Sequence, residues 1–169
     1  YTIYKVLGKG GYSRVFKVKH HLQGEFFAIK VFHESVNFKS VIDEYKALAI
    51  LNHPNIVKFK WNGELPNGQF YTLMEYFEGE SLSNYVKTEA RLPLYRVYQV
   101  AKDILTALVT MQAQLPKPIY HRDIKPQNII WDKEERFVLI DFNVASFSDD
   151  NRDFVGTNPY LAPDLITDH

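Results

Sequence analysis

In three short runs at the start of the chain, apolar side chains are interrupted only by single or paired polar residues. Residues 4–7, 13–19 and 25–31 are rich in β-branched and aromatic side chains, and turn residues separate them. Runs of this length and composition are typical of β-strands. We therefore expect three strands joined by tight turns in the first part of the chain.

Two longer segments have the spacing of amphipathic helices. In residues 38–51, apolar side chains recur at intervals of three and four, which places them on one helix face. They are Val41, Tyr45, Leu48 and Leu51. Residues 93–114 form the clearest helix, because Pro93 suits a first turn and one apolar stripe runs along the segment. This stripe consists of Val97, Ala101, Ile104, Leu105, Leu108 and Met111.

Two hairpins supply four further short strands. Residues 58–62 and 69–75 flank Leu65-Pro66-Asn67-Gly68, which is a strong turn signal. Residues 129–131 and 137–140 flank the polar turn 132–136. The second hairpin is expected to carry Asn128 and Asp141 to a common site.

Composition narrows the classes of function. The chain has 169 residues, enough to bury a core, and its net charge is zero. A neutral chain gives no reason to expect nucleic acid or an anionic membrane as a partner. The lack of cysteine excludes disulfides, zinc–thiolate sites and thiol catalysis. We recognise no signal segment and no apolar run long enough to cross a bilayer.

The main candidate chemistry lies in the loop at residues 120–130. It holds Asp123, Lys125 and Asn128, and Asp141 follows after an apolar strand. Mg²⁺ prefers hard oxygen ligands and usually takes one or two carboxylates together with phosphate oxygens. A nearby lysine can neutralise charge on a phosphoryl group during transfer. We therefore predict a magnesium–phosphate site, with a charged surface turn as the alternative.

This loop, from His121-Arg122-Asp123 to Lys125 and Asn128, resembles the catalytic loop of eukaryotic-type protein kinases. Asp141-Phe142-Asn143 stands where that family has Asp-Phe-Gly, and residues 156–164 resemble the end of its activation segment. The resemblance implies an α+β, protein-kinase-like two-lobe fold. Residues 1–76 would form the small antiparallel β lobe with helix C, and residues 77–169 the first part of a helical large lobe.

The first turn resembles the glycine-rich loop that covers the ATP phosphates in this family. A plain hairpin turn would look similar, but glycines also let backbone N–H groups approach phosphate oxygens. The residues assigned to this loop are Gly8, Lys9, Gly10 and Gly11. The resemblance further implies that Lys30 holds the α- and β-phosphates and that Glu44 pairs with Lys30. A merely solvated glutamate is the alternative for Glu44.

By the same resemblance, residues 71–77 form the last small-lobe strand and the hinge. Met74 would lie at the back of the adenine pocket, and backbone groups of Glu75 and Phe77 would bind adenine. A simple buried strand is the alternative. Ser81 could reach the ribose. Apolar contacts to adenine are assigned to Val15, Ala28 and Ile130.

The implied reaction is transfer of the ATP γ-phosphate to Ser or Thr hydroxyls of a protein substrate. Asp123 would orient the hydroxyl and accept its proton, and Lys125 would stabilise the transferring phosphoryl group. Asn128 and Asp141 would hold Mg²⁺. Lys125 is the residue typical of Ser/Thr kinases, and Thr157 fits the same specificity because it can bond the catalytic loop.

Several positions depart from the family pattern. Asn143 replaces a glycine, and Asn is among the few residues that tolerate positive φ. Ser13 replaces the third glycine of the loop, and Asp164 replaces a glutamate. With Asn143 after Asp-Phe and Asp164 after Ala-Pro, the sequence looks most like kinase modules of large bacterial or archaeal proteins, including some phage-defence systems.

Arg122 often meets a phosphate on the activation segment in this family. Here that segment offers few hydroxyls and several carboxylates, so we hypothesise that a carboxylate replaces the phosphate. The residues concerned are Ser146, Ser148, Asp149, Asp150 and Asp153.

Two other functions stay open. A pseudokinase would bind nucleotide or act as a scaffold, although Lys30, Asp123 and Asp141 are all present. A small-molecule kinase of related fold is the second alternative. The resemblance also implies further large-lobe helices and domains in the parent chain, so we expect residues 1–169 alone to be poorly stable and largely inactive. ATP and Mg²⁺ are the expected cofactors, in a reducing, cytoplasmic compartment.

Overall fold

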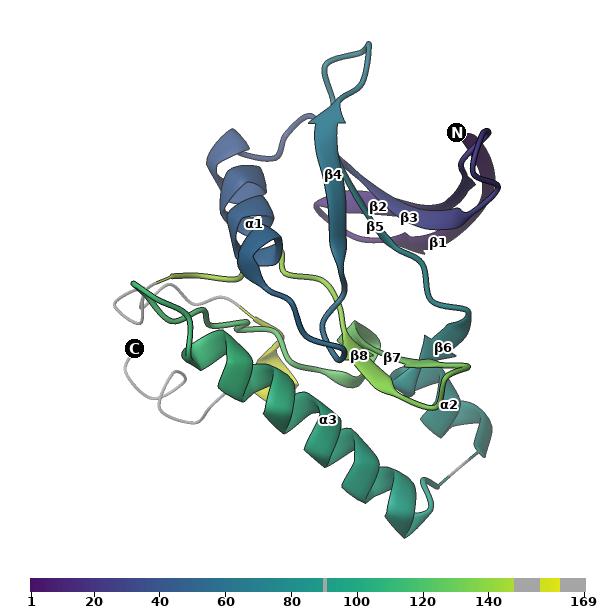
Figure 1. Cartoon of the computed structure of the whole chain (residues 1–169), viewed down its shortest axis with the longest axis vertical. Coiled ribbons are helices and arrows are strands. Elements are labelled where there is room, and N and C mark those ends of the chain that lie inside the picture. Colours follow the sequence, from purple (N-terminus) through teal and green to yellow (C-terminus); the bar gives the residue numbers. More distant parts are fainter. Residues whose placement is uncertain (90, 148–155, 162–169) are drawn as a thin grey trace. The chain divides into compact units, whose positions relative to one another are not determined.

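The computed structural model describes residues 1–89, 91–147 and 156–161 (Figure 1). The chain divides into two compact units. The first comprises residues 1–49 and 58–76, and the second comprises residues 50–57 and 77–169. The segment 50–57 thus groups with the second unit, and the lobe boundary expected after residue 76 stays a prediction. Among the residues singled out in the sequence, the following lie outside the described ones: Ser148, Asp149, Asp150, Asp153 and Asp164.

The first unit is built on a five-stranded antiparallel sheet with the spatial order β1-β2-β3-β5-β4. The strands are β1 (Thr2–Lys9), β2 (Ser13–Lys19), β3 (Phe26–Phe32), β4 (Phe59–Glu64) and β5 (Phe70–Glu75). Because side chains alternate between faces along a strand, one face gathers Val18, Phe27 and Leu73 into a buried core. The five strands expected here are confirmed, with small shifts at their ends.

Helix α1 (Phe38–Ile50) follows β3 in the chain. Asn37 caps its N-terminus, because its Oδ1 accepts a hydrogen bond from the Lys39 backbone N–H at 2.9 Å. The buried residues of α1 are Val41, Glu44, Ala47 and Leu48. The helix therefore buries a carboxylate among apolar side chains, and the solvated alternative for Glu44 is wrong.

The second unit contains a three-stranded sheet with the order β6-β7-β8 and two helices. Its elements are β6 (Gly79–Ser81), α2 (Leu82–Glu89), α3 (Leu94–Gln112), β7 (Ile129–Asp132) and β8 (Phe137–Leu139). Two short 3-10 helices, Pro126–Asn128 and Asn158–Tyr160, complete the described part. The β7–β8 hairpin and α3 were expected, whereas β6 and α2 were not.

Helix α3 packs against β8 with a face that differs from the predicted stripe. Its buried residues are Arg96, Ile104, Ala107 and Met111. Val97 and Leu105 are 46% and 60% exposed, so this part of the prediction is wrong. Leu105 lies about 100° around the helix from Ile104, on the flank of the buried face. Further large apolar residues exposed on α3 are Leu94, Tyr95, Tyr98 and Val109.

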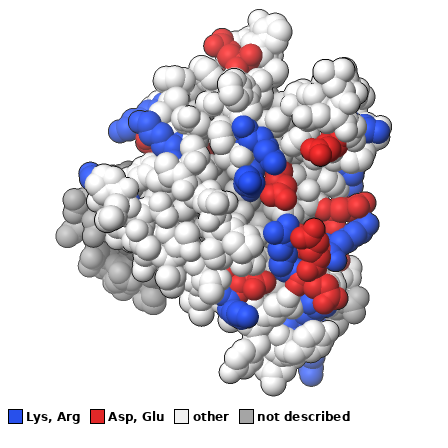
Figure 2. All heavy atoms as spheres, viewed as in Figure 1, with Lys and Arg blue, Asp and Glu red and all other residues white. Residues whose placement is uncertain are grey.

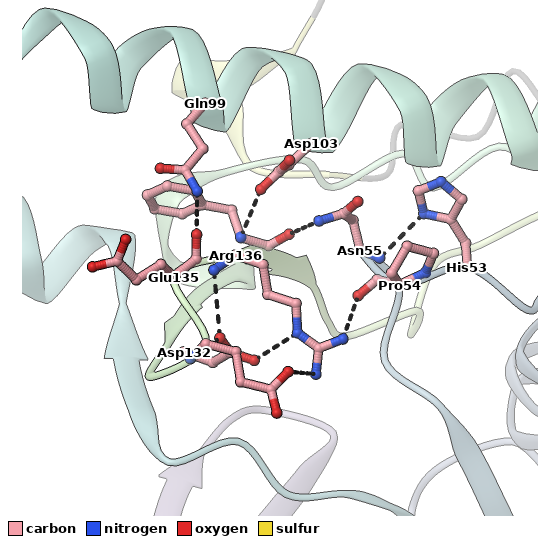
Figure 3. Close-up of polar contacts among 10 residues, drawn as sticks. His53, Pro54, Asn55, Gln99, Asp103, Asp132, Glu135 and Arg136 are labelled. Atoms are coloured by element: carbon pink, nitrogen blue, oxygen red, sulfur yellow. Dashed lines mark hydrogen bonds and ion pairs between the residues drawn. The ribbon is translucent and has the colours of Figure 1, made fainter.

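Residues 53–57 are bonded to β8 like an additional strand. The Leu139 N–H donates to the Asn55 carbonyl at 2.8 Å, and the Val57 N–H donates to the Leu139 carbonyl at 2.9 Å. The Asn55 side-chain amide also donates to the Phe137 carbonyl at 2.9 Å (Figure 3). The segment between α1 and β4 is therefore fixed by the strand that leads to Asp141.

Charged hydrogen bonds fix the β7–β8 turn (Figure 3). Arg136 donates through Nε to Asp132 at 2.8 Å and through a terminal nitrogen to the Pro54 carbonyl at 3.2 Å. From α3, Asp103 accepts the Phe137 N–H at 2.9 Å, and the Gln99 amide donates to the Glu135 carbonyl. The turn thereby joins α3 to residues 53–57.

His53 begins this segment as a neutral side chain. Burial lowers the pKa of His53, and the charge of Asp103 opposes this effect only in part. Its Nδ1 accepts a hydrogen bond from the Asn55 N–H at 3.1 Å, which requires an unprotonated Nδ1. His53 thus serves the loop conformation and is assigned no chemistry.

On the face drawn in Figure 2, basic and acidic side chains lie interspersed. This distribution agrees with the zero net charge of the chain. Within the described ranges, no helix combines the length and apolar character that crossing a membrane requires.

The Asn55 amide should be a measurable source of stability. Asn55 is 7% exposed, so Asn55→Ala leaves the Phe137 carbonyl buried without this donor. We expect the free energy of unfolding to fall by about 1–3 kcal/mol, measured by urea denaturation. Asn52→Ala, at an exposed position of the same segment, is the matched control and should change it by less than about 0.5 kcal/mol. Equal losses in both variants would contradict the assignment.

Candidate active site

The first unit contains a buried ion pair between its sheet and its helix. Lys30 Nζ on β3 lies 2.6 Å from Glu44 Oε1 on α1, and the two side chains are only 3% and 1% exposed. The low local dielectric strengthens the attraction, but both charges have lost their hydration. The pair therefore holds the Lys30 ammonium at a defined point beneath the sheet.

The sheet register places four predicted site residues on one face of the first unit. Val15 is paired with Lys30, and Ala28 is paired with Met74. Directly opposed residues project to the same face of an antiparallel sheet, and so do residues two apart on a strand. Val15, Ala28, Lys30 and Met74 therefore share a face, as required if they contact one ligand.

The glycine-rich turn is shorter than the sequence suggested. Gly8 and Lys9 are the last residues of β1, so only Gly10, Gly11 and Tyr12 lie between the strands. The Gly10 N–H donates to the Ser13 carbonyl at 2.9 Å. Gly10 and Gly11 are exposed, which leaves their backbone accessible to a ligand.

Two features restrain this turn. Ser13, the replacement for the third glycine, is 6% exposed and begins β2. His33 follows β3, and its ring nitrogen lies 3.2 Å from the Gly10 carbonyl, which accepts the hydrogen bond. The His33 N–H also donates to the Tyr12 carbonyl at 2.9 Å. Sequence analysis missed His33, because nothing in its local pattern indicates this contact.

The second unit gathers the catalytic-loop residues around Asp123. Lys125 Nζ lies 2.7 Å from Asp123 Oδ2, and the Thr157 hydroxyl donates to Asp123 Oδ1 at 2.7 Å. Lys125 also donates to the Thr157 oxygen at 2.7 Å. The expected bond between Thr157 and the catalytic loop is therefore present, and the three side chains form a closed triangle.

Asn128 links this triangle to the strand that precedes Asp141. Its side-chain nitrogen donates to the Asp123 carbonyl at 2.9 Å and to Asp123 Oδ2 at 3.0 Å. Its backbone carbonyl accepts the Ile140 N–H at 2.9 Å. Asp141 follows directly and has a φ of +64°, a value that non-glycine residues rarely adopt. Asn128 thus bonds the Asp123 side chain directly and fixes the backbone of Ile140, the residue before Asp141.

The donor set in this unit fits magnesium. Because the Asn128 side-chain nitrogen is used by Asp123, the amide oxygen is the atom left for a metal. Asn128 and Asp141 then offer two hard oxygen ligands, and Mg²⁺ takes its others from phosphate and water. The part of the chain that the structure describes contains no group of three or more His, Cys, Asp or Glu side chains suited to a metal.

His121 and Phe142 support the loop from below. Their rings meet edge to face with centroids 4.7 Å apart, and His121 also lies 3.2 Å from the Ile140 carbonyl. Arg122 has a φ of +64° and donates to the Val144 carbonyl at 2.5 Å. The loop is thus anchored to the residues that follow Asp141.

The segment after Asp141 differs from the expected backbone at Asn143, and it buries Ser146. Asn143 does not adopt positive φ; the strained backbone lies at Asp141 instead. Asn143 sits in a turn closed by the Ala145 N–H and the Phe142 carbonyl at 3.0 Å, which needs no glycine. Ser146 is 9% exposed and exchanges two backbone hydrogen bonds with Tyr120. A kinase could not reach its hydroxyl in this conformation.

The remaining predicted nucleotide contacts are placed as follows. Ile130 on β7 is paired with Ser81 on β6. The Ser81 hydroxyl accepts the Asn84 N–H at 3.2 Å, so it caps α2, a role that the sequence analysis did not foresee. Glu75 and Phe77 are half-buried, and Glu75 ends β5. The site residues therefore fall into two sets, one in each unit.

The electrostatics of Asp123 combine opposing effects. Burial raises the pKa of its carboxyl group, but hydrogen bonds from Lys125 and Thr157, the Lys125 charge and the Asn128 amide outweigh it. The net pKa lies below the usual value of 3.8. Asp123 is therefore ionised at neutral pH and can accept a proton or a hydrogen bond from a hydroxyl.

Fold and site together define a class of protein. An antiparallel β unit with a buried lysine–glutamate pair is followed by a partly helical unit with an Asp–Lys–Asn loop, which is the architecture of a kinase-like α+β fold. The whole chain, residues 1–169, matches the family model described as protein kinase domain. The chain therefore belongs to the protein kinase family, which confirms both the resemblance and the fold class.

Named relatives share this domain. The cAMP-dependent protein kinase type 3 of Saccharomyces cerevisiae is 30% identical over 99% of this chain and 42% of its own length. Serine/threonine-protein kinase RUNKEL of Arabidopsis thaliana is 32% identical over 99% of this chain and 12% of its own length. Serine/threonine-protein kinase gad8 of Schizosaccharomyces pombe is 28% identical over the whole chain and 31% of its own length. The chain thus spans less than half the length of these relatives.

Removing Lys30 should destabilise the protein strongly. Lys30→Met takes away the ammonium that neutralises the buried Glu44 carboxylate, so we expect a loss of about 3–5 kcal/mol in the free energy of unfolding. Lys133 pairs with Glu78 at 3.0 Å with both side chains more than half exposed. Lys133→Met is therefore the control and should cost less than about 1 kcal/mol. The free energy of unfolding is measured by chemical denaturation. Similar losses in Lys30→Met and Lys133→Met would contradict the conclusion that burial makes the Lys30–Glu44 pair important.

The Asp123 carboxyl group should titrate at unusually low pH. Because its folded-state pKa is depressed, its ionised form stabilises the fold above the unfolded pKa. That contribution is lost as pH falls through the folded-state value. Carboxyl-carbon NMR should give a midpoint below 3.8, the usual value, and Lys125→Met should raise it. A wild-type midpoint at or above the usual value would contradict the network.

Proposed function

We propose that this chain transfers the γ-phosphate of ATP to Ser or Thr hydroxyls of a protein substrate. The observation that best supports this is the triangle of Asp123, Lys125 and Thr157, with contacts of 2.7 Å on each side. An ionised carboxylate beside a fixed ammonium suits a reaction in which a hydroxyl attacks a phosphoryl group. The names of two of the relatives as serine/threonine-protein kinases add to this.

In the proposed reaction, the substrate hydroxyl donates a hydrogen bond to Asp123. Its oxygen forms a bond to the γ-phosphorus while the bond from that phosphorus to the β,γ-bridging oxygen breaks, and ADP leaves. The hydroxyl proton passes to the Asp123 carboxylate. Because the low pKa makes Asp123 a weak base, its larger contribution is orientation of the hydroxyl.

Lys125 has a second part in this scheme. Its ammonium lies near the Asp123 carboxylate and so near the transferring phosphoryl group, where it would offset developing negative charge. The Thr157 hydroxyl, by its hydrogen bonds to both side chains, would keep Asp123 and Lys125 in fixed positions relative to each other. A lysine and a threonine in these places are what a Ser/Thr-specific site is expected to carry.

Nucleotide binding is assigned to residues of both units. Lys30, held by Glu44, would bind the α- and β-phosphates, and the backbone of Gly8, Lys9, Gly10 and Gly11 would cover them. Val15, Ala28, Met74 and Ile130 would contact adenine, with hydrogen bonds from the backbone of Glu75 and Phe77. Asn128 and Asp141 would hold Mg²⁺, which when bound neutralises phosphate charge. Because Ser81 caps α2, its proposed ribose contact would share that hydroxyl.

The proposal makes Asp123 indispensable. Asp123→Asn keeps the size of the side chain but removes the carboxylate, so we expect transfer to fall by about 10²–10⁴-fold. The measurement is incorporation of labelled γ-phosphate from Mg·ATP by the full-length protein, followed by phosphoamino-acid analysis. Asp43→Asn, on α1, removes the same charge outside the loop and is the control.

The outcomes separate kinase from pseudokinase. Label on Ser or Thr that disappears in Asp123→Asn supports the proposal. Wild-type protein that transfers nothing, yet binds ATP with Mg²⁺ and loses binding in Lys30→Ala, would indicate a nucleotide-binding pseudokinase. Label on Tyr alone would overturn the assigned specificity.

A further inference from the structure

Lys17 occupies an unusual position on the sheet face that carries the predicted adenine contacts. On β2 it is paired directly with Ala28 of β3, and Ala28 is paired with Met74 of β5. Opposed residues share a face, so the Lys17 stem lies beside the residues assigned to adenine. No family motif in the sequence includes Lys17.

The Lys17 ammonium lies between two aromatic rings. Its Nζ is 4.0 Å from the centroid of the Phe26 ring and 4.2 Å from that of the Tyr76 ring. Both distances are well inside the range in which a cation is attracted to the face of an aromatic ring. The two ring centroids are 6.3 Å apart, and the Tyr4 ring meets Phe26 edge to face at 5.0 Å. Lys17 on β2 thus contacts β3 and the residue that follows β5, and Phe26 extends this cluster to Tyr4 on β1.

The contact between Lys17 and Tyr76 bears on nucleotide binding because of where Tyr76 lies in the chain. This residue stands between Glu75 and Phe77, whose backbone groups are proposed to bind adenine. A ring held by Lys17 restricts rotation about the Tyr76 backbone and so limits the directions of the neighbouring peptide groups. Correctly directed backbone donors and acceptors bind a ligand without a further cost of ordering.

We propose that Lys17 is a positioning residue for nucleotide binding, which fixes the hinge residue Tyr76 against β2 and β3 by paired cation–π contacts. This inference rests on the proposed hinge contacts to adenine. Lys17 touches neither phosphate nor the reacting atoms in this scheme. It should therefore act on ATP affinity and leave the transfer step largely unchanged.

The chain supplies a matched control in Lys19. It lies two residues further along β2 on the same face, but its Nζ is 5.6 Å from the Phe26 ring, and it has no described contact with Tyr76. Lys17→Met and Lys19→Met remove the same charge from the same strand. Lys17→Arg keeps a cation that binds ring faces well.

The experiment measures the dissociation constant of a fluorescent ATP analogue, and kcat and KM for ATP, in the full-length protein. Lys17→Met should raise the dissociation constant and KM by about threefold to tenfold, as expected for loss of partly exposed cation–π contacts. The value of kcat should stay within about twofold, and Lys17→Arg and Lys19→Met should stay within about twofold in every constant. A general loss of structure would not be rescued by arginine.

A double-mutant cycle guards against indirect effects. In a Tyr76→Leu background the ring is gone, so Lys17→Met should change affinity by less than about twofold. A full effect of Lys17→Met in that background would overturn the inference, and so would equal effects of the two lysine variants. Wild-type protein that binds and transfers while Lys17→Met binds equally well would sink this inference alone. Wild-type protein that binds no nucleotide would overturn both this inference and the proposed function.

Discussion

Backbone hydrogen bonds along β8 are the constraint on which the second unit depends. β8 pairs with β7 on one edge and with residues 55–57 on the other, while α3 packs against it. Its residues Phe137, Val138 and Leu139 are fully buried, so each backbone group needs a partner within the protein. Asn55 and Asp103 supply the partners that strands alone cannot. The chain therefore reaches Asp141 directly from a strand whose backbone is fixed on both edges.

Asn128 connects the β7–β8 hairpin to the catalytic loop by hydrogen bonds. Its backbone carbonyl bonds Ile140, at the end of the β7–β8 hairpin, and its side chain bonds Asp123. A single residue thus fixes both the predicted base and the entry to the predicted metal ligand. The positive φ of Asp141 is tolerated next to Ile140, whose backbone Asn128 holds, and such strain is typical of functional sites. Asn128 therefore sets the geometry of the loop in addition to the metal contact proposed for it.

Motifs predicted the site better than periodicity predicted the packing. The structure brings Asp123, Lys125, Asn128 and Thr157 together, and the sequence singles them out because the proposed chemistry requires fixed residue types at fixed spacing. The stripe on α3 was partly wrong because apolar residues such as Leu105 are exposed while Arg96 is buried. Arg96 can be buried because it lies over the Trp131 ring at 4.7 Å and bonds Gln99. The Trp131 contact joins residues distant in sequence, and no local pattern indicates it.

Strand β6 and helix α2 were missed for a related reason. β6 is very short, and it exists because β7 offers a free edge at Ile130 and Trp131. Gly79 permits that pairing, since a Cβ there would lie 1.9 Å from the Trp131 carbonyl oxygen. Ser81 then caps α2. In contrast, the five strands of the first unit are rich in β-branched and aromatic residues and are bounded by turn residues, so they are visible in the sequence.

The two units stabilise their functional charges in different ways. Lys30 and Glu44 are almost fully buried, so the pair is rigid and either charge alone is costly. Asp123 and Lys125 are more exposed, at 15% and 21%, and water screens part of their interaction. This difference suits the proposed roles. An anchor for phosphate needs a fixed position, whereas a residue that exchanges a proton with substrate needs access to it. Burial restrains the geometry of Lys30. For the less buried pair of Asp123 and Lys125, hydrogen bonds to the Thr157 hydroxyl provide this restraint.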